Sequence, residues 1–178
     1  MCIEVAAHRG HVADYPENTM AAYRSAYENG ADMIELDLRM TKDGQIVLIH
    51  DEDLARTADV AGKVHELTLE EILRADVGIK KGEEFKGTRV PTLEQFCEFA
   101  ARESTAMQFN FEFKDNFGYG EEWAKTCADK IIATVEHYGL WERSFINCFD
   151  GKVLKYVEEK YDGRFRLHGF YSYLLQQL

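Results

Sequence analysis

The chain has 178 residues, of which 46% are hydrophobic and 12% aromatic, enough to bury the core of one domain. Its formal net charge is −11, and the acidic residues are spread along the chain rather than gathered in a tail. This charge argues against binding to nucleic acid or to an anionic membrane, which needs a basic surface. An anionic small substrate remains compatible with it, provided that a cation is bound locally.

The N-terminal stretch "MCIEVAAHRG" lacks the charged start and long apolar stretch of a secretory signal. No apolar run approaches the roughly 20 residues that a membrane span needs. The cysteines lie far apart without CxxC spacing, so we expect mostly buried, reduced thiols at Cys2, Cys97, Cys127 and Cys148. These features predict a cytoplasmic protein without a transmembrane segment.

Apolar runs bounded by turn signals alternate with helical patterns, which is typical of a β/α architecture. The first predicted elements are a strand at 3–8, a helix capped by Asn18 or Thr19 and ended by Gly30, and strands at 31–41 and 45–50. The Asp43-Gly44 pair between the last two strands is a strong hairpin signal.

The stretch from His50 to Pro91 has the pattern of an insertion, at about residues 51–90, with one short helix that begins at the capping box Thr68 to Glu71. After it we expect a helix from the capping box at Thr92 to about residue 103, a strand at 107–114, a helix at 121–139, a strand at 144–149, a helix at 151–161 and a strand at 165–171.

This succession suits an α/β barrel or an open parallel sheet. A complete (β/α)8 barrel usually needs about 250 residues. We therefore expect residues 1–178 to form a single TIM-barrel-like domain that is truncated before its last strands. Either the chain is a fragment, or a partner subunit, as in a homo-oligomer, covers the open edge of the barrel.

Charged residues interrupt strands that otherwise have the composition of a core. Strand side chains alternate, so Glu35, Asp37 and Arg39 lie on one face of their strand, and Glu112 and Lys114 share a face of another. A solvent-exposed face is the simpler interpretation. In a barrel, however, polar side chains that point inward are costly without partners.

A divalent cation would provide such a partner. Crowded carboxylates raise one another's pKa unless a cation lies between them. Glu35, Asp37 and Glu112 are expected towards the C-terminal ends of their strands, where the sites of α/β barrels form. Because three carboxylates supply hard oxygen ligands, the pattern predicts Mg²⁺ or Ca²⁺ rather than zinc.

Two histidines are candidates for acid–base catalysis beside this predicted metal site. His8 ends the first strand, with Arg9 next to it as a fork for an anionic oxygen. The hairpin is expected to bring His50 near Asp37. Two imidazoles, a cation and basic side chains suit the cleavage of a phosphate ester, in which one imidazole removes a proton and the other protonates the leaving alkoxide.

The segments "HRG", "PENT", "ELDLRMTKDG", "LIHD", "PTLEQF" and "FEFK" occur in this order between residues 6 and about 115, and together they resemble the glycerophosphodiester phosphodiesterase family. The resemblance implies a TIM-like barrel related to the phosphatidylinositol-specific phospholipases. It also implies hydrolysis of glycerophosphodiesters to glycerol 3-phosphate and an alcohol. The implied roles are acid and base for His8 and His50, metal ligands for Glu35, Asp37 and Glu112, and phosphate contacts for Arg9 and Lys114.

The sequence departs from the family pattern in two places. Cys148-Phe149 stands where the family commonly has Ser-Phe, and the family's last two strands have no counterpart. Two alternatives therefore stay open. One is a metal- or phosphate-binding protein without catalysis; the other is a related phosphodiesterase acting on lysophospholipids, which would need an apolar rim that the sequence does not clearly show.

Overall fold

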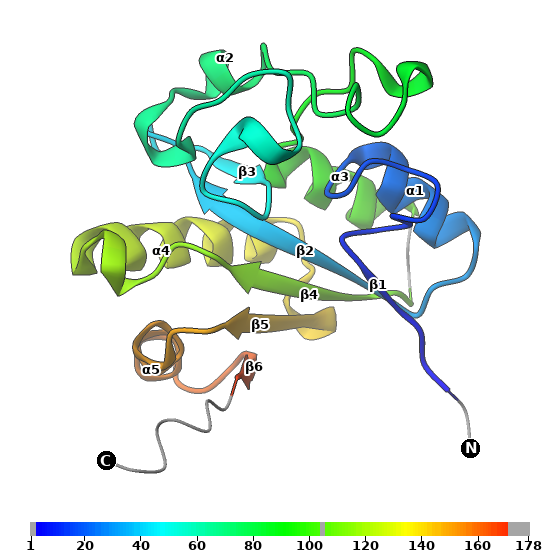
Figure 1. Cartoon of the computed structure of the whole chain (residues 1–178). Coiled ribbons are helices and arrows are strands. Elements are labelled where there is room, and N and C mark those ends of the chain that lie inside the picture. The colour runs from blue at the N-terminus through cyan, green and yellow to red at the C-terminus, as the bar shows by residue number, and fades with distance from the viewer. Residues whose placement is uncertain (1–2, 104–105, 171–178) are drawn as a thin grey trace.

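The computed structural model describes residues 3–103 and 106–170. Within these residues six strands form one sheet in the order β1-β2-β4-β5-β6, and β3 pairs with β2 beside this row. The strands are β1 (Ala6–His8), β2 (Met33–Met40), β3 (Ile46–Leu48), β4 (Gln108–Phe113), β5 (Ser144–Cys148) and β6 (Arg166–Gly169). The α-helices are α1 (Met20–Glu28), α2 (Leu69–Ile72), α3 (Leu93–Glu103), α4 (Glu121–His137) and α5 (Gly151–Lys160), as Figure 1 shows.

Neighbouring strands in the row β1-β2-β4-β5-β6 are all parallel, and a helix lies between each successive pair along the chain. This is the α/β arrangement that the sequence predicts. The first strand is shorter than expected, because the side chain of Asp32 accepts the hydrogen bond from the Val5 N–H at 2.8 Å. The last predicted strand extends to residue 171, which lies outside the described residues.

The predicted hairpin is present, since β3 runs antiparallel to β2 and Gly44 in the turn has a φ of 77°. The Ile49 N–H still donates to the Asp37 carbonyl at 3.0 Å. Beyond it the predicted strand ends early, because the His50 carbonyl accepts from the side chain of Arg39 instead of from a strand. His50 therefore belongs to a loop.

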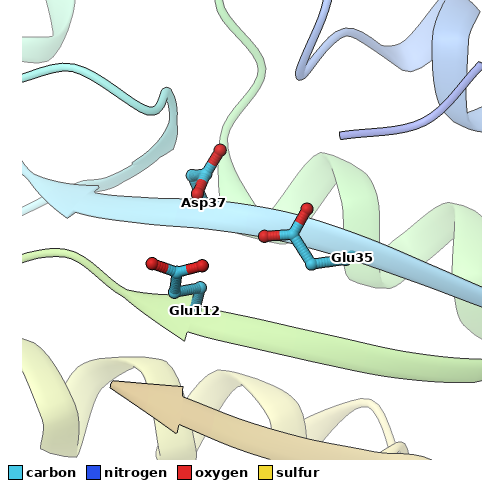
Figure 2. Close-up of side chains that lie close together, drawn as sticks. All are labelled: Glu35, Asp37 and Glu112. Carbon is cyan, nitrogen blue, oxygen red and sulfur yellow. The ribbon is translucent and has the colours of Figure 1, made fainter. Parts of the chain in front are cut away.

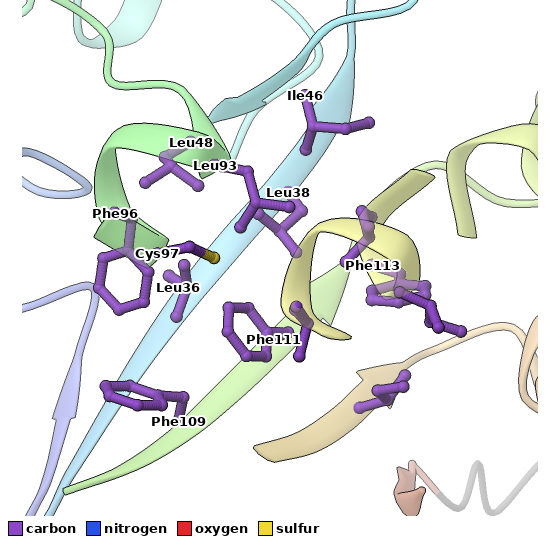
Figure 3. Close-up of a cluster of buried hydrophobic side chains, with 14 of the residues drawn as sticks. Leu36, Leu38, Ile46, Leu48, Leu93, Phe96, Cys97, Phe109, Phe111 and Phe113 are labelled. Atoms are coloured by element: carbon purple, nitrogen blue, oxygen red, sulfur yellow. The ribbon is translucent and has the colours of Figure 1, made fainter. Parts of the chain in front are cut away.

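One face of the sheet packs into the hydrophobic core. Figure 3 shows Leu36 and Leu38 of β2 beside Phe111 of β4, packed against side chains of α3 such as Phe96. Residues of this kind are almost fully buried, and burial of each stabilises the fold by about 1.5–3 kcal/mol. Because strand side chains alternate, the residues between them point to the opposite face.

Local signals in the sequence set the helix ends. Thr19, and not Asn18, caps α1, because its Oγ1 accepts from the Ala22 N–H at 3.3 Å. The capping boxes at Thr68 and Thr92 are both formed. None of the helices in the described part of the chain is both long and apolar enough to cross a membrane.

Three of the four cysteines lie in the described part of the chain. Cys97, Cys127 and Cys148 are buried there as free thiols, as the sequence predicts. Cys2 lies outside the described residues.

The segment between β3 and α3 has a small core of its own, which includes Val47, Leu54 and Ile72. Asp76 organises its second half. This buried carboxylate accepts hydrogen bonds from the backbone N–H groups of Gly78 at 2.9 Å, Ile79 at 3.1 Å and Gly87 at 2.6 Å. These hydrogen bonds, the one from Gly87 foremost, hold the pKa of Asp76 below its usual range.

An Asp76→Asn variant should be less stable than the wild type, and the difference should depend on pH. Because the pKa of Asp76 is lowered in the folded state, its stabilisation is complete above the ordinary aspartate pKa of about 4 and is lost as the pH falls through the folded value. Urea unfolding at pH 7 and about pH 3 measures this. The exposed Glu83→Gln is the control, and a difference that is the same at both pH values would contradict the assignment.

Candidate active site

Three carboxylates meet on the face of the sheet opposite the core. Glu35 and Asp37 come from β2 and Glu112 from β4, where Asp37 and Glu112 are register partners. One oxygen of each lies within 4.8 Å of the others, and the residues are 6%, 0% and 5% exposed. Figure 2 shows the carboxylates pointing toward one another. The alternation of residues in the two strands produces this convergence.

Basic side chains surround the carboxylates. The Nζ of Lys114 lies 3.0 Å from Asp37 Oδ1 and also contacts Glu112. The Nε of Arg9 lies 3.3 Å from Asp37 Oδ2, and its backbone N–H donates to Glu35 Oε2 at 2.9 Å. The two residues that the sequence assigns to phosphate binding are thus both at the carboxylate cluster, where they offset part of its charge.

The conformation of the segment after β1 holds Arg9 in place. Arg9 has a φ of 61° and Gly10 a φ of 85°, and a Cβ at Gly10 would lie 2.7 Å from the Cβ of Ala22. Only glycine fits there, which explains the third residue of "HRG". Asn18, with a φ of 53°, donates from Nδ2 to Asp37 Oδ2 at 2.7 Å.

The cluster suits a divalent cation. Burial, followed by the charge of Asp37, raises the pKa of Glu35 to about 8. Its Oε1 is buried and has no hydrogen-bond partner within residues 3–103 and 106–170. This unpaired buried oxygen and the three converging carboxylates match the preference of Mg²⁺ and Ca²⁺ for oxygen ligands.

His8 lies at the edge of the carboxylate cluster. Its Nε2 is 3.9 Å from Glu35 Oε2, and its side chain is 65% exposed. Burial of part of the ring, together with the charge of Arg9, lowers the pKa of His8, so the neutral imidazole prevails near pH 7. The ring is accessible to a ligand and is close to the carboxylates.

His50 is oriented by its neighbour in sequence. Its Nδ1 lies 2.6 Å from Asp51 Oδ1, while its carbonyl accepts from Arg39 Nε at 2.9 Å. The residue before it, Ile49, holds this loop beside Asp37, because the Ile49 N–H donates to the Asp37 carbonyl oxygen.

Arg39 shares the face of Glu35 and Asp37 but does not join them. Its Nη1 lies 3.3 Å from Asp115 Oδ1 and donates to the hydroxyl of Tyr119 at 3.3 Å. Since Arg39 also donates to the His50 carbonyl, its side chain connects β2 to the His50 loop and to the segment after β4.

Sequence reasoning missed several polar residues at this face of the sheet. Asn18 was considered only as a helix cap, and Asp51, Asp115 and Asn147 were not singled out. Asn147 is the register partner of Glu112, and its buried Oδ1 has no hydrogen-bond partner in the described part of the chain. The alternation of β5 was the available signal, since it places Asn147 on the face of Glu112.

Replacing Glu35 with Gln should stabilise the protein in the presence of a chelator at alkaline pH. A carboxyl with a raised pKa contributes stability below its ordinary value of about 4.3, and this contribution is lost as the pH rises through about 8. The variant should therefore exceed the wild type by a few kcal/mol near pH 8 and by much less near pH 5. Urea unfolding at both values tests this, and equal stabilities at pH 8 would refute it.

Comparisons with known proteins identify the family of this chain. The model of the glycerophosphoryl diester phosphodiesterase family matches residues 8–173. The chain is 41% identical over 155 residues to a glycerophosphodiester phosphodiesterase of Caldanaerobacter subterraneus subsp. tengcongensis, and covers 61% of that relative with 87% of its own length. For a similar enzyme of Bacillus altitudinis the identity is 38%, with 82% of this chain and 58% of the relative covered. The chain thus spans about 60% of the length of these relatives.

Solved structures share the fold. A glycerophosphodiester phosphodiesterase of Agrobacterium tumefaciens superposes with a TM-score of 0.81 at 31% identity, covering 93% of this chain and 66% of the other. A phosphodiesterase of Oleispira antarctica, solved in complex with the product sn-glycerol-3-phosphate, gives a TM-score of 0.82 at 25% identity, covering 94% and 64%. The predicted TIM-barrel-like fold class is confirmed.

Proposed function

This chain belongs to the glycerophosphoryl diester phosphodiesterase family, and from that premise we propose that it hydrolyses glycerophosphodiesters to glycerol 3-phosphate and an alcohol with the help of Mg²⁺ or Ca²⁺. The observation that carries the proposal is the buried cluster of Glu35, Asp37 and Glu112, bordered by basic side chains and by His8. The product bound in the Oleispira antarctica neighbour supports the substrate class.

The proposal treats residues 1–178 as one barrel domain with an insertion at about 51–90. The insertion supplies Asp51, the partner of His50, so its packing against the sheet contributes to the site.

Each charged group at the site has a distinct task in this mechanism. A divalent cation held by Glu35, Asp37 and Glu112 would act as a Lewis acid and offset the negative charge that develops on the phosphoryl oxygens. Arg9 and Lys114 bind and orient the phosphate by charge-assisted hydrogen bonds. They lie at the rim of the carboxylate cluster, where an anionic substrate would otherwise be repelled.

The two histidines transfer protons in this proposal. Because Nδ1 of His50 is engaged by Asp51, its Nε2 is the nitrogen left to exchange a proton with the substrate. A carboxylate partner stabilises an imidazolium, so we assign His50 as the acid that protonates the leaving alkoxide and His8 as the base. The base takes the proton of the attacking hydroxyl, which comes from water or from the substrate's own glycerol.

The variants His8→Ala and His50→Ala should each lower kcat about 10²–10⁴-fold, the usual contribution of a general acid or base. Release of glycerol 3-phosphate from glycerophosphocholine measures this, with circular dichroism to confirm folding. His137→Ala, on the exposed last turn of α4, is the control and should retain full activity. A rate within twofold of the wild type would remove the altered histidine from the mechanism.

Cation binding should depend on the carboxylate cluster. After treatment with a chelator, calorimetric titration should show one Mg²⁺ or Ca²⁺ bound by the wild type and affinity lowered at least about 100-fold in Asp37→Asn, because the site loses a charged ligand. Glu70→Gln, which alters an exposed carboxylate of α2, should bind like the wild type. Turnover that persists in excess chelator would contradict the metal role, whereas binding without turnover would favour a non-catalytic binding protein.

A further inference from the structure

A continuous chain of hydrogen-bonded charges leads from His50 to Arg9. Asp51 accepts from His50 Nδ1 through one oxygen and from Arg56 Nε through the other. The two terminal nitrogens of Arg56 then donate to Glu17, Nη1 to Oε2 at 2.8 Å and Nη2 to Oε1 at 2.6 Å. Glu17 Oε1 also accepts from Arg9 Nη1 at 3.1 Å. The guanidinium of Arg56 therefore links the carboxylate that binds His50 to the carboxylate that binds Arg9.

The joined segments are distant in sequence. Glu17 belongs to the loop between β1 and α1, whereas Arg56 ends a short 3₁₀-helix, Leu54–Arg56, inside the insertion. This 3₁₀-helix is capped by Asp53, which accepts from the Ala55 N–H at 2.8 Å, so the backbone that carries Arg56 is fixed locally. The planar fork of arginine suits the bidentate contact with Glu17, which a lysine would not reproduce.

The carboxylates in the chain are ionised. Burial is the largest single influence and acts to raise the pKa of Asp51 and of Glu17. The hydrogen bonds and charge of Arg56, together with His50 at Asp51 and Arg9 at Glu17, outweigh it and lower both pKa values. An ionised Asp51 is the form that accepts the Nδ1–H of His50 and holds the ring in the tautomer with a free Nε2. In the described part of the chain, the side-chain hydrogen bonds of Arg56 go to Asp51 and Glu17 and not to His8 or His50.

We propose that Arg56 is a positioning residue, which clamps Asp51 and Glu17 together and thereby fixes both the tautomer of His50 and the place of Arg9. The proposal rests on the proposed function, because it assigns a purpose to the orientation of His50. An isolated exposed ion pair contributes little, but here one guanidinium makes three hydrogen bonds to two half-buried carboxylates. Partners that orient metal-bound histidines typically change activity by about 10–100-fold, and we expect an effect of that order at His50.

Lys81 provides a control that separates the proposed role of Arg56 from a purely structural one. Lys81 also joins the insertion to the loop between β1 and α1, since its Nζ lies 2.8 Å from the carbonyl oxygens of both Val12 and Ala13. This contact ties together the same two parts of the chain without touching the charges that lead to His50. Loss of Lys81 therefore reports on the packing of the insertion alone.

The test compares Arg56→Ala with Lys81→Ala by two readouts. The ¹⁵N chemical shifts of the imidazole nitrogens of His50, measured without substrate, report its tautomer and do not require turnover. Hydrolysis of glycerophosphocholine gives kcat and KM separately. Glu17→Gln is the second variant, which weakens the clamp while leaving Arg56 and its bond to Asp51 in place.

In the wild type we expect the Nδ1–H tautomer of His50. Arg56→Ala should shift the population towards a mixture of tautomers and lower kcat about 10-fold or more, and Glu17→Gln should do so more weakly. Lys81→Ala should leave both the tautomer and kcat within twofold of the wild type. The proposal is overturned if Arg56→Ala keeps the wild-type tautomer, or if Lys81→Ala causes the same changes. If the wild type shows no turnover, the proposed function is refuted. The ¹⁵N chemical shifts of His50 would still show whether Arg56 fixes its tautomer.

Discussion

Mutual repulsion among Glu35, Asp37 and Glu112 is the constraint on which the rest of this structure depends. Three carboxylates within 4.8 Å of one another, all buried, would not remain ionised together without compensating charge. Lys114 and Arg9 supply part of it, while burial, followed by the charge of Asp37, raises the pKa of Glu35 to about 8. The divalent cation that we propose would complete the balance and leave the bordering basic residues available for an anionic phosphate.

The β/α architecture allows this concentration of charge without loss of the core. Leu36 and Leu38 pack against the helices on one face of β2, while Glu35 and Asp37 use the other. The segments at the ends of the strands then bring Arg9, His8 and Lys114 to the carboxylate cluster. The same strands thus present apolar side chains to the core on one face and the carboxylate cluster on the other.

Much of this was predictable from the sequence, because the signals are local. Alternation placed Glu35, Asp37 and Glu112 on inner faces, and the Asp43-Gly44 turn and the capping boxes at Thr68 and Thr92 gave the hairpin and two helix starts. Arg39 followed the same alternation, but its long side chain reaches Asp115 instead of the carboxylate cluster, which no local pattern encodes. The contact between Glu17 and Arg56 joins residues 39 positions apart on segments without periodicity, so only the folded chain reveals it. Asn18 escaped notice because a helix cap explains an asparagine equally well.

Anomalous diffraction from crystals soaked in Mn²⁺, a substitute for Mg²⁺ or Ca²⁺, tests the central claim most directly. The account predicts a single strong peak whose position lies within about 2.0–2.6 Å of a carboxylate oxygen from each of Glu35, Asp37 and Glu112. It is contradicted if that space contains no anomalous peak while the ion occupies other sites.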